Sequence, residues 1–137
     1  MPFPVEEKYI LQVESQLNII FPTEFKKRMM RLNGGECIIE ESEFKLYPFF
    51  DTSDRKRISR TCNHIVLETR NAREWKGFPE NAIAIGSDGS GDQLILMHDG
   101  NGVLSEEIYL WNHEERFVKK ITTSIYRLSS LNSTNSF

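Results

Sequence analysis

The sequence predicts an α+β domain, in which a mainly antiparallel, twisted sheet is packed by about four helices. Three observations support this: apolar residues recur at helical spacing near the N-terminus, alternating residues mark short strands, and residues 81–102 have the pattern strand, glycine loop, strand, turn. The chain of 137 residues is long enough for one domain with a sizeable core. We expect that domain to cover residues 1–131, with a frayed tail at residues 132–137.

Composition and charge narrow the class of function. The chain is 39% hydrophobic and has a formal net charge of −3, which is ordinary for a globular domain. A mildly acidic protein is a poor direct binder of nucleic acid, because neutralising phosphates needs a basic face, but it suits a basic protein partner. No apolar run is long enough to span a membrane, and the N-terminus lacks a signal-peptide pattern, so we expect a cytoplasmic protein.

Two helices are predicted before residue 35. Residues 4–19 carry an apolar stripe with Val5, Tyr9 and Val13 at i+4 spacing. A second helix follows Phe21-Pro22 and ends at Asn33-Gly34-Gly35, since glycine suits the end of a helix. Its basic residues are expected to face water: Lys26, Lys27, Arg28 and Arg31.

Residues 37–40 and 44–47 are predicted to form a strand pair that Pro48 ends. Four carboxylates crowd this hairpin: Glu36, Glu40, Glu41 and Glu43. Carboxylates so close repel one another unless water or a partner compensates them. The hairpin is therefore either a solvated turn or a site for a cation or a basic partner.

A third helix is predicted over residues 58–75, from apolar residues that step by three and four. Cys62 falls on its buried stripe, where a thiol behaves as a small hydrophobe.

The central strands have the clearest pattern. Ile83 and Ile85 share one face of the first strand, and residues 94–97 are apolar without a break, as in a strand covered on both faces. Asp99-Gly100 and Asn101-Gly102 favour a tight hairpin turn after the second strand.

Residues 107–111 alternate, with Ile108 and Leu110 on one face and Tyr109 and Trp111 on the other. A polar turn, a short strand at residues 116–120 and a final helix starting near Thr122 or Thr123 complete the prediction.

Catalytic and metal-binding patterns are mostly missing. The three histidines are spread over different elements, and the series Asp88, Ser90, Asp92, Asp99 fails as a calcium loop because Gln93 stands where glycine is required. The glycines lack the Lys that ends a phosphate loop. We therefore expect no cofactor, no metal and no enzymatic activity, although a small ligand-binding pocket beside the glycine loop stays open as an alternative.

Two segments resemble the SUKH superfamily. Phe21-Pro22 through Asn33-Gly34-Gly35 is similar to its Leu-Pro-x-x-(Tyr/Phe) to Asn-Gly-Gly segment, with Phe21 where Leu is usual. Gly86 to Asp92 is similar to its Gly-x-x-x-x-Gly-Asp segment. The resemblance covers residues 5–128 and implies a SUKH-like α+β fold, no catalysis, and binding of a cognate toxin domain, commonly a nuclease. The superfamily includes bacterial immunity proteins and relatives among fungal cell-wall regulators.

The resemblance and the acidic charge together suggest a partner-binding role. An acidic inhibitor can be steered to a basic nuclease toxin and can cover the surface that binds phosphates. The partner-binding residues that we expect are Glu40, Glu41, Glu43, Asp88, Asp92, Tyr109 and Trp111. Tyr109 and Trp111 are either exposed aromatic anchors or core residues, and Asp92 either contacts a partner or supports its own loop. The alternative function is a non-catalytic intracellular scaffold that binds another protein.

Overall fold

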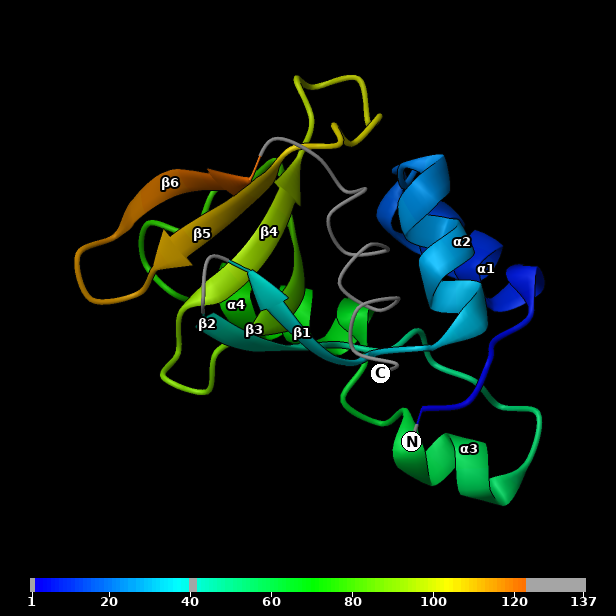
Figure 1. Ribbon diagram of the computed structural model, residues 1–137. Coiled ribbons are helices and arrows are strands. Elements are labelled where there is room, and N and C mark those ends of the chain that lie inside the picture. The colour runs from blue at the N-terminus through cyan, green and yellow to red at the C-terminus, as the bar shows by residue number, and fades with distance from the viewer. Residues whose placement is uncertain (1, 40–41, 123–137) are drawn as a thin grey trace.

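The structure, a computed structural model, describes residues 2–39 and 42–122. Within them the chain forms one six-stranded antiparallel sheet whose strands follow sequence order, with helices packed against it (Figure 1). The helices are α1 (Glu7–Leu17), α2 (Thr23–Arg31), α3 (Arg55–Arg60) and α4 (Ile65–Arg73). The strands are β1 (Gly35–Ile39), β2 (Ser42–Leu46), β3 (Ala82–Ser87), β4 (Gln93–Met97), β5 (Ile108–Asn112) and β6 (Phe117–Thr122). The predicted α+β class is confirmed.

The single helix predicted over residues 58–75 is wrong, because the chain there forms α3 and α4 with a break between them. The break is fixed by a contact that periodicity cannot show: the Thr61 hydroxyl donates to the Arg57 carbonyl (2.7 Å) and accepts from the Asp51 amide (3.0 Å). Cys62 is consequently exposed, not buried. The predicted final helix and tail lie outside the described residues.

The connection between β4 and β5 also differs from the prediction. Asp99-Gly100 and Asn101-Gly102 do not form a tight hairpin turn, because β4 ends at Met97 and β5 begins at Ile108. The loop between them reaches the chain that follows α1. There the Ile20 amide donates to the Gly102 carbonyl (2.8 Å), and the Leu104 amide donates to the Ile20 carbonyl (3.0 Å).

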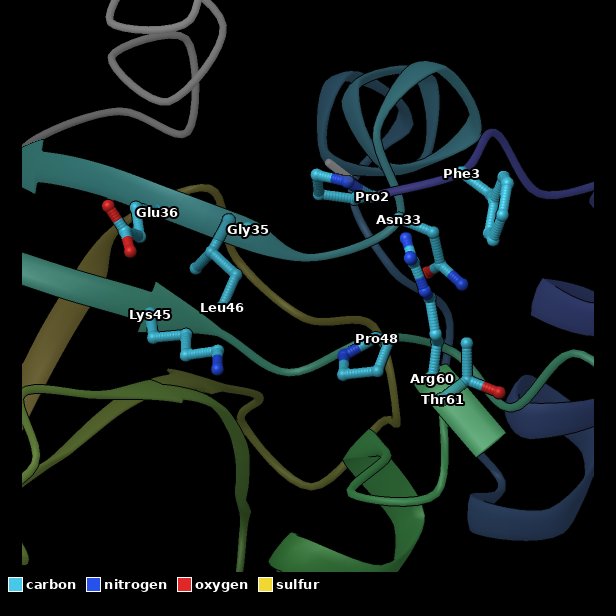
Figure 2. A pocket seen from close by; sticks show the side chains of 10 residues that line it. All are labelled: Pro2, Phe3, Asn33, Gly35, Glu36, Lys45, Leu46, Pro48, Arg60 and Thr61. Atoms are coloured by element: carbon cyan, nitrogen blue, oxygen red, sulfur yellow. The ribbon is translucent and has the colours of Figure 1, made fainter. Parts of the chain in front are cut away.

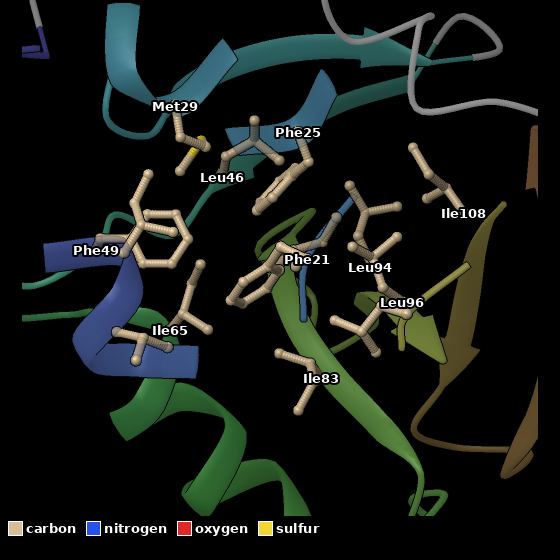
Figure 3. Packing of buried hydrophobic residues seen from close by; sticks show 14 of the residues in the cluster. Phe21, Phe25, Met29, Leu46, Phe49, Ile65, Ile83, Leu94, Leu96 and Ile108 are labelled. Atoms are coloured by element: carbon tan, nitrogen blue, oxygen red, sulfur yellow. The ribbon is translucent and has the colours of Figure 1, made fainter. Parts of the chain in front are cut away.

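The sheet has a core on each face. On one face, α1, α2 and their connection pack against the strands, and the core there includes Phe21, Phe25, Ile83, Ile85, Leu94, Leu96 and Ile108 (Figure 3). On the other face, α4 packs against β3, and its Ala72 belongs to a cluster with Ala84, Ile95 and Trp111 (Figure 1). The predicted alternation of β3 and β5, and the two-sided burial of β4, are therefore confirmed.

The hairpin formed by β1 and β2 lies at one edge of the described sheet, and only one of its faces is buried. Cys37, Ile39, Phe44 and Leu46 point into the core on the α2 side. Side chains between them point the opposite way and are exposed: Glu36, Ile38, Glu43 and Lys45. Three of these four exposed side chains are charged, so the hairpin presents an open charged face.

Arg28 corrects the prediction that the basic residues of α2 all face water. Its side chain is 1% exposed, and its Nη1 donates to the carbonyls of Leu32 and Gly34. Burial lowers the pKa of Arg28 to about 10, which leaves the guanidinium protonated at neutral pH. The Asn33 side chain donates from Nδ2 to the Phe49 carbonyl (2.8 Å), and its Oδ1 accepts from the Phe49 amide (2.7 Å). The turn from α2 into β1 is thus held by buried polar side chains.

We expect His64 to make the stability of α4 dependent on pH. As N-cap its Nδ1 accepts from the Leu67 amide (3.2 Å), and its ring stacks on Phe50. Burial, with the nearby Arg70 charge, lowers the pKa of His64 below its usual 6.5. The unfolded chain therefore binds the proton more readily. We expect the cap's full contribution above pH 6.5, and its loss as the pH falls through the lowered pKa.

The matched variant is His64→Asn, since asparagine caps a helix without titrating. Urea unfolding between pH 7.5 and 5 should show a smaller loss of stability for His64→Asn than for the unsubstituted protein. Equal losses would mean that His64 does not cause the pH dependence.

Candidate protein-binding surface

A shallow groove lies between the open face of the β1–β2 hairpin and the glycine loop, residues 88–92. Its volume is about 200 Å³, and it is lined by Glu36, Glu43, Phe44, Lys45, Ser87, Asp88 and Gly89. The strand register creates it: Lys45 pairs with Ser87, so the outward side chains of β2 lie beside the start of the loop. We call this feature the acidic groove.

The charge of the acidic groove is negative. Of the described residues that line it, Glu36, Glu43 and Asp88 carry carboxylates, and Lys45 carries the opposing charge. Glu36 faces Lys45 across the strand pair. All four side chains are exposed, where ion pairs contribute little to folding. The surplus of carboxylates is therefore suited to contacts with a partner, and it favours a basic one.

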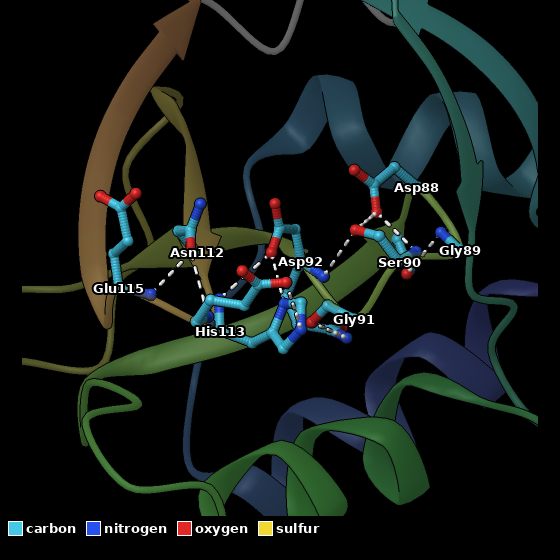
Figure 4. Close-up of polar contacts among 11 residues, drawn as sticks. Asp88, Gly89, Ser90, Gly91, Asp92, Asn112, His113 and Glu115 are labelled. Carbon is cyan, nitrogen blue, oxygen red and sulfur yellow. Dashed lines mark hydrogen bonds and ion pairs between the residues drawn. The ribbon is translucent and has the colours of Figure 1, made fainter.

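Asp88 and Asp92 have different roles in the glycine loop (Figure 4). Asp88 is exposed, and its Oδ1 accepts from the Ser90 amide (2.9 Å) and hydroxyl (2.6 Å), which is a local turn. Asp92 Oδ1 lies 2.6 Å from His113 Nδ1 and accepts from the His113 amide at 3.1 Å. A Cβ on Gly91, whose φ is +111°, would come within 3.0 Å of the same ring. Asp92 thus ties the loop to the turn between β5 and β6.

This difference gives a prediction for two alanine variants. Asp92→Ala should lower the free energy of unfolding by about 1–2 kcal/mol, because two half-buried contacts to His113 are lost. Asp88→Ala should change it by less than about 0.5 kcal/mol, as is usual at exposed positions. Urea titration of both variants checks this. Equal losses would show that Asp92 does not anchor the loop.

The two aromatic residues of the predicted site lie elsewhere. Trp111 is 1% exposed, its Nε1 donates to the Gly77 carbonyl (3.2 Å), and its ring packs edge-on to Phe78. Of the two alternatives for Trp111, the structure shows the core residue and not the exposed anchor, because the segment that follows α4 covers this face of β5. Tyr109 is half-buried and donates to Glu107 Oε2 at 2.8 Å, away from the groove lining.

Of the predicted set, the structure brings Glu43 and Asp88 into one groove. Glu40 and Glu41 lie outside the described residues. Sequence reasoning named Glu36 in the acidic hairpin but not among the expected partner-binding residues, and it did not name Lys45. Strand alternation places both on the same outward face as Glu43. Sequence reasoning also overlooked Trp75, which is 54% exposed and lies edge-on to His113.

The described residues offer little reactive chemistry. Burial raises the pKa of Cys37 to about 11, so its thiol stays protonated at neutral pH. Within residues 2–39 and 42–122, no group of three His, Cys, Asp or Glu side chains is placed to hold a metal. No helix in these ranges has both the length and the apolar character needed to cross a membrane.

The fold and the groove define a class: a small α+β domain that presents an open charged surface beside an edge hairpin. The model of the SMI1 / KNR4 family (SUKH-1) matches residues 4–128, and the chain belongs to this family. A comparison with curated proteins finds no match. Domains of this family are generally non-catalytic, and membership is consistent with an immunity or regulatory role.

Proposed function

We propose that this protein is an immunity protein that binds a cognate toxin domain and neutralises it by covering its surface. The observation that supports this most is the acidic groove, where Glu36 and Glu43 of the hairpin lie with Asp88 of the glycine loop. A nuclease toxin needs a basic surface to bind phosphates. An acidic surface is attracted to it over several ångströms and competes with the nucleic acid.

The acidic groove is suited to binding and not to catalysis. The groove is shallow and its charged side chains are exposed, whereas an enzyme needs a site where groups are held and partly desolvated. We further propose that the protein acts in the cytoplasm, where a nuclease toxin would meet its substrate.

A non-catalytic regulatory scaffold is the second candidate. The family match is consistent with this role as well, because the SUKH superfamily, which the sequence resembles, includes regulators. The same groove would then bind a basic segment of an unrelated protein.

The test is co-expression with a nuclease-like toxin domain encoded beside the gene. We expect cells that make both proteins to survive, and a catalytically inactive toxin to co-elute with this protein in gel filtration. Cell death at equal expression, with separate elution of the two proteins, would contradict the immunity function. Survival without a complex would contradict neutralisation by binding.

A further inference from the structure

A second groove adjoins the acidic groove and differs from it in charge. Its volume is about 460 Å³, and it lies between the N-terminal segment, the start of the hairpin and the end of α3 (Figure 2). Glu36 and Lys45 line both grooves, so they form the shared wall. Figure 2 shows these two side chains at one end of the second groove and Arg60 at the other. We call it the α3 groove.

The α3 groove has a preformed apolar lining. Pro2, Phe3 and Pro48 contribute to it, and each of them is partly exposed. The N-terminal segment is fixed in place, because the Asn33 amide donates to the Phe3 carbonyl (2.9 Å) and the Val5 amide donates to the Met30 carbonyl (3.1 Å). An occupant would not have to order these walls, which lowers the entropic cost of binding.

The wall on the α3 side is positive. Lys56, Arg57 and Arg60 lie around the Phe3 ring, at 5.8, 4.2 and 5.1 Å from its centroid. Arg57 is paired with Asp54 at 2.6 Å and with Asp51 at 3.6 Å. Of these three cations Arg60 lines the groove, and Lys45, which faces Glu36 across the strand pair, lines its opposite end.

We propose that the α3 groove binds an extended protein segment in which an apolar side chain is followed by carboxylates. The apolar side chain would lie against Pro2 and Pro48, and the carboxylates would reach Arg60 and Lys45. This inference rests on the proposed function for its biological partner: the same partner would place a basic patch in the acidic groove and an acidic segment in the α3 groove. Two adjoining grooves of opposite charge fix the orientation of a partner better than one.

The test uses the full chain labelled with ¹⁵N and the capped peptide acetyl-Gly-Leu-Asp-Glu-Glu-Gly-amide. We expect it to shift the amide resonances of Gly35, Leu46 and Thr61. Replacing its Leu by Ser should weaken binding about tenfold, which corresponds to about 1.4 kcal/mol. The protein variant Lys45→Gln with Arg60→Gln should weaken it by at least as much, whereas Arg73→Gln, an exposed position on α4, should not.

Three results would overturn the inference. These are no shift of the three amides at millimolar peptide, equal binding by the double variant, or shifts of the same amides by a short oligothymidylate but not by the peptide. Any of them could occur while co-expression still protects cells from the toxin. The failure of this inference is therefore distinct from the failure of the proposed function.

Discussion

Replacing both Glu43 and Asp88 by lysine is expected to weaken binding to a basic toxin domain by about 100-fold or more. Each substitution removes an attraction and adds a repulsion in a groove that has few other charges. Both side chains are exposed, so the free energy of unfolding should change by less than about 1 kcal/mol in total. Calorimetry with a catalytically inactive toxin measures the affinity, and urea titration confirms that the fold is intact.

The control must carry the same net charge. Glu80→Lys with Glu106→Lys changes two exposed carboxylates, in the loops before β3 and before β5, that do not line either groove. This variant should weaken binding less than about threefold at physiological salt, since distant exposed charges are screened. Equal weakening by both double variants would mean that net charge acts without the acidic groove.

Replacing Arg28 by methionine is expected to lower the free energy of unfolding by about 3 kcal/mol. Methionine keeps much of the length and apolar volume, but the carbonyls of Leu32 and Gly34 then lose a charged donor inside the protein. A buried acceptor left unsatisfied costs about 1–3 kcal/mol. Urea unfolding measures this loss, and we expect the dependence of the unfolding free energy on urea concentration to stay unchanged.

Arg31→Met is the matched control, because Arg31 lies on the same helix and its side chain is exposed. We expect a change of less than about 0.5 kcal/mol. A similar small change for Arg28→Met would show that the guanidinium does not hold the turn from α2 into β1.

The sheet was predictable because strand pleating has a period of two. Ile83 and Ile85 in β3, and the alternating residues of β5, follow that period directly. The spacing of Arg28 indicated burial although its charge did not: it stands three residues after Phe25 and four before Leu32, on the apolar stripe of α2. Its charge suggested a side chain exposed to water, but the backbone carbonyls of the following turn accept its hydrogen bonds.

Other features depend on contacts between distant parts of the chain. The end of α3 depends on Thr61 meeting Asp51, and the burial of Trp111 depends on the segment after α4, where Phe78 packs on its ring. Alternation shows that two faces exist, but not which of them is covered. The acidic groove likewise depends on β2 pairing with β3, which brings Glu43 and Asp88 together across a long stretch of sequence. The sequence suggested both residues without showing that they share one surface.

Zero-length crosslinking of the complex tests the central claim most directly. A carbodiimide joins a carboxylate to a lysine that it contacts, and mass spectrometry of the complex with inactive toxin identifies each pair. We predict crosslinks from Glu36, Glu43 or Asp88 to lysines of the toxin, and their loss when the complex is dissociated by salt. Crosslinks confined to carboxylates outside the acidic groove, such as Glu7 of α1 and Glu80 before β3, would contradict it.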